Sequence, residues 1–393
     1  MTAPVVDEDR VAVATLLRVA EPAVAGVVRH VRAHGIAQTL SDIAAGAPID
    51  GIDVAALQHR LRTASGEADL AAAAAVGARL VCPGDDEWPL LLDDLRWVDR
   101  DCLGLWVRGE RSLAATTERA VAVVGTRAAT DYGIHVAGQL SYDLAELGWT
   151  VVSGLAFGVD ATAHRGALGA GGLTVAVLAC GVDVPYPRGN RSLYDRIAAD
   201  GLVVSEHPPG AAPQRPRFLV RNRVIAALAA GTVVVEMAAR SGARSTATHA
   251  AFLNRHVMCV PGPVTSATSA GCHQFLRDRP EAVLVTKAAE VIEQCGHMGE
   301  LATPETGPTV TRDLLGPTVA RVLEGVPVHG VADVASIART AGTNVEVTAA
   351  SLAALAATGL VRRVDEKWGM TTDARRDRRA RAGGVDQLAL DWW

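Results

Sequence analysis

The chain has 393 residues and almost half of them are apolar, so it is long enough to build two or three separate cores. Its formal net charge of −5 excludes a positive field over the whole surface, so any phosphate binding must be local. No charge-free run of about 18 apolar residues occurs, and the acidic start lacks a signal-peptide pattern. We therefore expect a cytoplasmic protein that does not enter a membrane.

The cysteines are scattered, and no two of them form a Cys-x-x-Cys pair. They are Cys82, Cys102, Cys180, Cys259, Cys272 and Cys295. This spacing predicts neither a disulfide framework nor a zinc site, so we expect reduced thiols and no metal. Lys287 and Lys367 are the only lysines, and this bias makes arginine abundance alone weak evidence for nucleic-acid binding.

Residues 1–78 are predicted to form a helical domain of the SAM-like type. Their apolar residues recur at helical spacing, with breaks at Gly35 and Gly51. The predicted helices are Val11–Val19, Pro22–His34 and Val54–Arg62, followed by an alanine run that ends at Gly77. Residues 80–118 contain Pro83, Pro89 and three tryptophans, and there we expect an irregular entry into the next domain.

Residues 79–295 form the predicted core, because from residue 120 short β-branched runs alternate with helical stretches. The predicted strands are Ala120–Val124, Thr150–Val152, Thr174–Leu178, Leu202–Val204, Thr232–Val235, His256–Val260 and Val283–Val285. The predicted crossover helices are Gly133–Leu147, Val159–Leu168, Asn190–Ala199, Asn222–Ala230 and Thr246–Asn254. Repeated strand–helix units with continuous apolar strands predict an α/β fold with a doubly wound parallel sheet.

Residues 296–316 are rich in glycine, proline and threonine and are predicted to form a linker. Residues 317–372 then match a winged-helix domain. Its predicted helices are Pro317–Leu323, Val331–Arg339 and Val345–Ala357, and its hairpin joins Leu360–Val364 to Lys367–Thr371. The third helix contains no lysine or arginine, which favours contact with protein over contact with duplex DNA. The arginine-rich tail, residues 373–393, is expected to be disordered.

Small and polar residues follow the predicted strands at one edge of the sheet, where open parallel sheets bind their ligands. Gly125-Thr126-Arg127 follows the first strand, Ser153-Gly154 the second and Ser241-Gly242 the fifth. Arg221-Asn222-Arg223 adds two arginines beside an apolar helix. Glycine lets backbone N–H groups approach an anion, and arginine recognises phosphate with two donors. This pattern predicts a phosphate site at the carboxyl edge of the sheet.

The usual nucleotide and hydrolase fingerprints are missing. No Gly-x-Gly-x-x-Gly follows the first strand, and there is no P-loop, no His-Glu-x-x-His and no Gly-x-Ser-x-Gly. We therefore expect no cofactor. Asp160 and His164 could form an acid–base pair, but a helix-capping Asp160 and a structural His164 are the favoured interpretation. For Glu236, orienting Arg221 or Arg223 is favoured over a role as a base, and Asn222 is assigned to capping the helix that follows it.

With these motifs in view, the chain resembles the DNA-processing protein A family, also called DprA or Smf. The matching motifs are Val123–Arg127, Tyr132-Gly133, Val152–Ala156, Gly158–Asp160, Ala163-His164, Tyr186-Pro187, Ser205-Glu206, Arg221–Arg223, Ser241-Gly242 and Val260–Gly262. They extend over about half of the chain and occur in the order that the strand–helix pattern expects.

This resemblance implies an extended Rossmann-like core that binds single-stranded DNA, forms a homodimer and has no catalytic role. It also implies that the protein protects incoming or processed DNA and loads the RecA recombinase, in competence, natural transformation and DNA recombination. The implied phosphate-track residues are Gly125, Thr126, Arg127, Ser153, Gly154, Arg188, Arg221 and Arg223. Phe157, Asn222, Ser241 and Gly242 complete the expected DNA-binding set, with Asp160, His164 and Glu236 in support.

Three departures from the family pattern affect this expectation. Phe157 stands where a basic residue is common, and two interpretations stay open: stacking on a base or packing under the loop. Phe218-Leu219-Val220 replaces the usual proline and arginine, and the resemblance is weakest after Pro263. Two alternatives also remain, a nucleotide phosphoribohydrolase that uses Glu236 and a scaffold without a working crevice.

Overall fold

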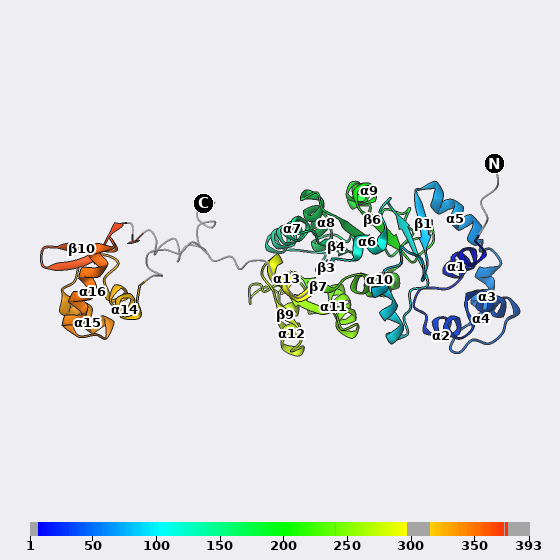
Figure 1. The fold of residues 1–393 in the computed structure, drawn as a ribbon. Helices are drawn as coiled ribbons and strands as arrows, with labels where there is room; N and C mark the ends of the chain where they lie inside the picture. The colour runs from blue at the N-terminus through cyan, green and yellow to red at the C-terminus, as the bar shows by residue number, and fades with distance from the viewer. Residues whose placement is uncertain (1–6, 240, 297–314, 373, 376–393) are drawn as a thin grey trace. The chain divides into compact units, whose positions relative to one another are not determined.

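The computed structural model describes residues 7–239, 241–296, 315–372 and 374–375 (Figure 1). The expected linker therefore lies mostly outside the described residues, as do Arg240 and nearly all of the arginine-rich tail. The chain divides into two compact units, residues 1–302 and 303–393. The amino-terminal helices and the sheet thus belong to one unit, and the predicted domain boundary at residues 78–79 stays a prediction.

The described part of the first unit begins with five helices, α1 Glu8–Val19, α2 Ala25–His34, α3 Ile36–Ala45, α4 Val54–Leu61 and α5 Gly66–Ala75. Their inward faces enclose a small core of aliphatic side chains that includes Leu16, Val27, Ile43 and Leu57. A second face of α1 and α5 packs through Val13, Leu17 and Ala73 against the sheet. The amino-terminal helices therefore pack on the sheet through apolar contacts, in addition to being connected to it by the chain.

The described residues of this unit form one nine-stranded sheet, with the order β1-β2-β6-β5-β4-β3-β7-β8-β9. Its strands are β1 Ala78–Val81, β2 Leu105–Arg108, β3 Ala120–Val124, β4 Thr150–Ser153, β5 Thr174–Val177, β6 Leu202–Ser205, β7 Gly231–Val234, β8 His256–Cys259 and β9 Val283–Leu284. Strands β3 to β9 are parallel, which confirms the predicted doubly wound α/β sheet.

The expectation of an irregular entry over residues 80–118 was wrong. This segment contributes β2, which pairs antiparallel with β6 and carries β1 at the edge of the sheet. Each of these two strands has four residues. Four residues are too few for an alternation of apolar and polar side chains to be recognised in a segment rich in proline and tryptophan. The pairing of these strands depends on their tertiary surroundings.

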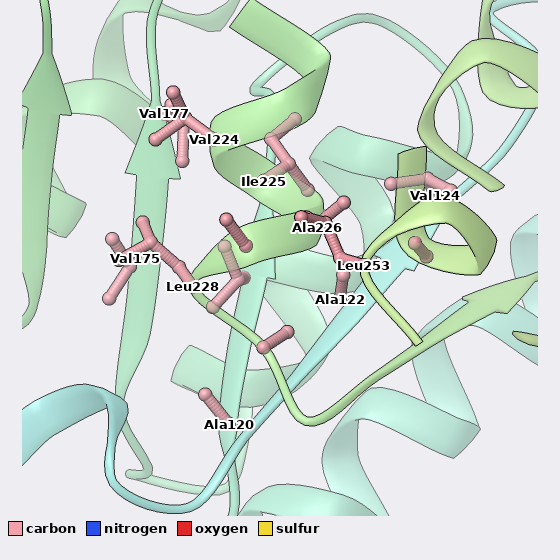
Figure 2. Packing of buried hydrophobic residues seen from close by; sticks show 14 of the residues in the cluster. Ala120, Ala122, Val124, Val175, Val177, Val224, Ile225, Ala226, Leu228 and Leu253 are labelled. Carbon is pink, nitrogen blue, oxygen red and sulfur yellow. The ribbon is translucent and has the colours of Figure 1, made fainter. Parts of the chain in front are cut away.

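Helices cover both faces of the sheet. One face contacts α10 Arg215–Ala227, α11 Gly242–Phe252 and α12 Ala270–Asp278, and the other contacts α7 Asp131–Glu146, α8 Val159–Gly169, α9 Arg191–Asp200 and α13 Ala288–Cys295. Figure 2 shows α10 packed on the sheet, with Val224 beside Val177 and Leu228 near Val175. The strands are buried on both sides, which explains their continuous Val and Ala runs.

The predicted helix Asn222–Ala230 starts seven residues too late. In the structure α10 runs from Arg215 to Ala227, with Gln214 at its N-cap and Pro216 in its first turn. Proline there is favourable because its missing N–H needs no partner at a helix start. The sequence-based assignment followed the apolar run and overlooked this proline signal, and the shift changes which way each arginine points.

The described part of the second unit has three helices and a hairpin, as expected. They are α14 Pro317–Gly325, α15 Val334–Ala341 and α16 Val345–Ala357, followed by β10 Val361–Val364 and β11 Lys367–Met370. The two strands pair antiparallel across Asp365-Glu366. The winged-helix assignment stays a prediction. Among the described residues of both units, no helix is long and apolar enough to cross a membrane.

Candidate functional site

A polar crevice of about 300 Å³ lies at the carboxyl edge of the parallel strands. It forms beyond β3, β4 and β7, where the chain has moved from one side of β3 to the other. This reversal of strand order is where doubly wound sheets bind their ligands. The lining residues include Gly125, Thr126, Arg127, Ala156, Asp160, Phe218, Leu219, Arg221, Asn222, Ser241, Gly242 and Thr246.

The loop after β3 brings an arginine to the rim of the crevice. Gly125 is packed so closely against Val159 that a larger residue would collide with it, and Thr126 N–H donates to the Glu236 carbonyl oxygen at 2.8 Å. Arg127 is exposed, and its guanidinium carbon lies 5.2 Å from the centroid of the Phe218 ring. Among the described residues Arg127 has no ion-pair partner, so its charge is available to a ligand.

The loop after β4 supports the crevice from below. Ser153 is fully buried and donates its hydroxyl to the Val123 carbonyl oxygen at 2.7 Å, while Gly154 is buried too. The backbone N–H groups of Gly154 and Ala156 donate to Asp160 Oδ2 at 3.2 and 3.4 Å. Neither Ser153 nor Gly154 is among the lining residues of the crevice, so the structure does not bring these two predicted phosphate contacts to it.

Arg221 is the cation at the floor of the crevice. Its side chain is buried, and Nη1 donates to the carbonyl oxygens of Gly154 and Val177, the first at 2.9 Å. Burial lowers the pKa of Arg221 to about 10, with the Asp160 carboxylate acting in the opposite direction. The group therefore keeps its charge near neutral pH. Gly154 must stay small, because a Cβ there would overlap the guanidinium of Arg221.

Arg223 lies away from the crevice, contrary to its expected place on the phosphate track. Its side chain is fully buried, and Nη2 donates to Glu206 Oε1 at 2.6 Å. Residues two apart on a helix do not share a face, so Arg221 and Arg223 point to different sides of α10. The sequence-based assignment began this helix at Asn222, after Arg221, and therefore did not place the two arginines on one helix. Arg223 is not among the residues that line the crevice.

Asn222 does not cap a helix, because it lies in the middle of α10. Its Nδ2 donates to the Gly242 carbonyl oxygen at 3.2 Å and so joins α10 to the start of α11. Ser241 caps α11 by accepting from Ala243 N–H at 3.3 Å, and Gly242 is exposed at the crevice. The amino terminus of α11 therefore offers the crevice a partial positive charge and free backbone donors.

Glu236 does not orient Arg221 or Arg223, contrary to the expectation from the sequence. Its carboxylate is buried and accepts from Thr130 N–H at 2.9 Å, from Thr130 Oγ1 at 2.6 Å and from Thr268 Oγ1 at 2.9 Å. These bonds hold the loop after β3 to the loop after β8. The sequence could not show this partner choice, because both threonines come from loops whose position depends on the whole sheet.

Asp160 and His164 are both buried, and their contacts fit the structural interpretation. Asp160 accepts from the loop after β4, although Gly158 and not Asp160 occupies the N-cap of α8. His164 Nδ1 lies 2.7 Å from Thr174 Oγ1, and burial together with the Arg221 charge lowers its pKa to about 3. A histidine that stays neutral at neutral pH and faces a core threonine is not placed to exchange protons with a ligand.

Aromatic side chains lie on the rim near Arg127. The rings of Tyr186 and Phe218 have centroids 5.6 Å apart. Phe157 is 51% exposed, while the edge of its ring approaches Gly189. Its two interpretations, stacking and packing, therefore both stay open. Arg188 is exposed near this rim but does not line the crevice.

Sequence reasoning overlooked some lining residues, among them Leu219 and Thr246. Thr246 is buried on α11, and nothing in its sequence context marks it as part of a site. No group of three or more potential metal ligands occurs among the described residues. A buried cation, a helix amino terminus and an aromatic rim together suit an anionic ligand.

Comparisons with known proteins point to one family. The family model described as DNA recombination-mediator protein A matches residues 79–296. A Mycobacterium tuberculosis protein named "Putative DNA processing protein DprA" is 47% identical over 300 residues, which cover 74% of this chain and 77% of that protein. DNA processing protein DprA of Bacillus subtilis is 36% identical over 179 residues, covering 46% of this chain and 60% of that protein. The X-ray structure of DNA processing protein A from Streptococcus pneumoniae matches with a TM-score of 0.61 and 29% identity, covering 73% of this chain and 97% of that one.

Proposed function

This chain belongs to the DNA recombination-mediator protein A family, and we propose that its role in DNA processing is to bind single-stranded DNA in the crevice beyond β3, β4 and β7. The observation that carries the proposal is the buried Arg221 guanidinium in the crevice that the amino terminus of α11 also lines. A phosphodiester group matches both, since it accepts from arginine and from free helix N–H groups.

A polymer fits this crevice better than a free nucleotide does. Exposed Arg127 lines the crevice beside Phe218, whose ring contacts that of Tyr186, and exposed Arg188 and Arg215 lie two or three residues from these rings in the sequence. Single-strand binders combine such a cationic path with aromatic faces on which bases stack in a sequence-tolerant way. The first unit therefore offers both parts of a single-strand site at one sheet edge.

The finer part of the proposal rests on family membership. We infer a cytoplasmic, non-catalytic homodimer that protects incoming or processed single strands and loads the RecA recombinase onto them, in natural transformation and recombination. The contacts of Glu236 support binding over the phosphoribohydrolase alternative, because its carboxylate bonds Thr130 and Thr268 and is not among the crevice-lining residues. Incubation with nucleoside monophosphates should accordingly release no free base.

A salt titration tests the proposal. Binding of a fluorescent oligo-dT should weaken as salt rises, with a slope of about −0.7 in log K against log salt for each phosphate neutralised. Replacing both Arg127 and Arg188 with alanine should flatten that slope by about 1.4 and weaken binding to all sequences alike. The exposed Arg62 is the matched control, and Arg62→Ala should leave the slope unchanged. An unaltered slope in the double variant would contradict the assignment.

A further inference from the structure

The start of α10 is attached to the amino-terminal helices by a two-donor ion pair. Arg217, in the first turn of α10, donates from Nε and Nη2 to the two carboxylate oxygens of Glu21 at 3.0 and 2.6 Å. Glu21 follows directly after α1 and its C-cap Ala20. The Arg217 side chain is 15% exposed, so water screens this pair only in part.

A second contact holds the loop that leads into α10. Arg18 of α1 donates from Nη2 to the Pro209 carbonyl oxygen at 2.8 Å while it pairs with Asp69 of α5. Arg217 Nη1 also donates to the Ala212 carbonyl oxygen at 2.8 Å. The amino-terminal helices thus fix both the incoming loop and the first turn of the helix.

The joint is built around a polar cavity of about 140 Å³. Its lining includes Glu21, Arg217 and His207 together with small apolar residues such as Ala20 and Ala211. The ion pair and the carbonyl contacts lie at this cavity and join the first turn of α10 to α1 across it. His207 is buried beside them, and burial together with the Arg217 charge lowers its pKa to about 4.

One turn beyond Arg217, the same helix forms one wall of the crevice through Phe218, Arg221 and Asn222. A helix moves as a rigid element over such a short distance, so a change at its first turn shifts these side chains. We propose that Glu21 is a positioning residue for DNA binding and that the amino-terminal helices set the place of α10 at the crevice. This inference rests on the proposed single-strand binding and adds to it a control site outside the crevice.

An alternative role for Glu21 predicts the opposite change in DNA affinity when its charge is removed. If Arg217 were a phosphate ligand that Glu21 holds back, removing the Glu21 charge would release a cation toward DNA. Binding would then become tighter, and the salt slope would steepen by about 0.7. If Glu21 positions α10, removing its charge weakens binding and leaves the number of neutralised phosphates unchanged.

The test measures oligo-dT affinity across salt for the full chain and for Glu21→Gln. We expect binding about three- to tenfold weaker, a size in keeping with the loss of one partly buried ion pair, with the salt slope unchanged. The exposed Glu67 of α5 is the matched control, and Glu67→Gln should bind like the wild type. Tighter binding with a steeper slope, or affinity equal to the wild type, would overturn the inference.

A charge exchange keeps the test decisive if Glu21→Gln alters folding. Glu21→Arg combined with Arg217→Glu restores an ion pair at the joint and should recover most of the lost affinity, while either change alone should not. If the double variant unfolds at the wild-type temperature and still does not recover affinity, positioning by this ion pair would also be contradicted. Absence of single-strand binding by the wild type would instead remove the proposed function itself, so the two failures are distinguishable.

Discussion

The two halves of α10 place the same residue type in opposite surroundings. In the first half, residues 215–220, Arg215 is exposed and Arg217 is half-buried in its ion pair with Glu21, whereas every residue from Arg221 to Ala227 is buried. Arg215 is available to a ligand, and Arg223 is closed inside the protein with Glu206. Arg221 stands at the boundary, since it holds two carbonyl oxygens and also faces the crevice. Proximity to a motif therefore does not decide whether an arginine binds DNA.

The sharpest way to break this comparison is to remove Arg223. Arg223→Ala leaves Glu206 buried without its cation, and breaking a buried pair costs about 3–5 kcal/mol in the free energy of unfolding. Urea unfolding measures the loss. Arg215→Ala, the control in the exposed half, should change stability by no more than about 0.5 kcal/mol. Equal stability losses in the two variants would erase the distinction between the halves.

A paired replacement separates the ion pair from the space it fills. Arg223→Met combined with Glu206→Leu removes both charges and keeps apolar volume at the site. Such exchanges are often neutral for stability, so the double variant should unfold at higher urea than Arg223→Ala. A double variant as unstable as the single one would mean that Arg223 acts through some contact other than Glu206.

The next largest effect is expected from acid, which should lower the free energy of unfolding of the first unit through two buried histidines. Burial lowers the pKa of His164 to about 3 and that of His207 to about 4, against an ordinary value of 6.5. Below pH 6.5 these histidines bind protons in the unfolded chain but stay neutral in the folded protein. Their contribution to the free energy of unfolding is therefore fully present above pH 6.5 and is lost as the pH falls toward the folded pKa values. Each histidine should contribute a slope of about 1.4 kcal/mol per pH unit, or about 2 kcal/mol between pH 6.5 and 5.

Urea unfolding at pH 7, 6 and 5 measures this loss. His164→Asn should reduce the dependence on pH by one histidine's share, whatever its effect on stability at pH 7. His59→Asn, at an exposed position of α4, is the matched control for the substitution itself. A pH dependence in His164→Asn equal to that of the wild type would show that His164 does not cause the loss.

The sequence predicted the elements of this molecule better than it predicted side-chain partners. Continuous apolar runs fixed the seven parallel strands and the carboxyl edge where the crevice lies, because strand burial shows directly in composition. The directions of Arg221 and Arg223 depend on where α10 begins, and a start seven residues too late hid them. The partners of Glu236 come from loops brought together by β3, β7 and β8, which no local pattern records.

Two contributions of Arg221, its hydrogen bonds to carbonyl oxygens and its positive charge, can be measured separately. Arg221→Lys keeps the positive charge, but the lysine side chain is one atom shorter than the path to Nη1, the atom that donates to both the Gly154 and Val177 carbonyl oxygens. Stability should fall by about 1–2 kcal/mol, while the salt slope of oligo-dT binding stays at the wild-type value. Arg221→Gln should flatten that slope by about 0.7. If both variants flatten the slope equally, charge is not what Arg221 supplies to DNA.

The smallest effect on stability is expected at Gly242, where α11 begins beside the crevice. A Cβ at Gly242 would meet open space, so Gly242→Ala should change the free energy of unfolding by no more than about 0.5 kcal/mol. It would nevertheless crowd a phosphate seated on the amino terminus of α11, so oligo-dT binding should weaken about threefold or more at an unchanged salt slope. Gly316, the N-cap of α14, is the matched control, because it also opens to free space at a helix start. Gly316→Ala should bind like the wild type, and equal binding by Gly242→Ala would place the phosphate on the arginine side of the crevice alone.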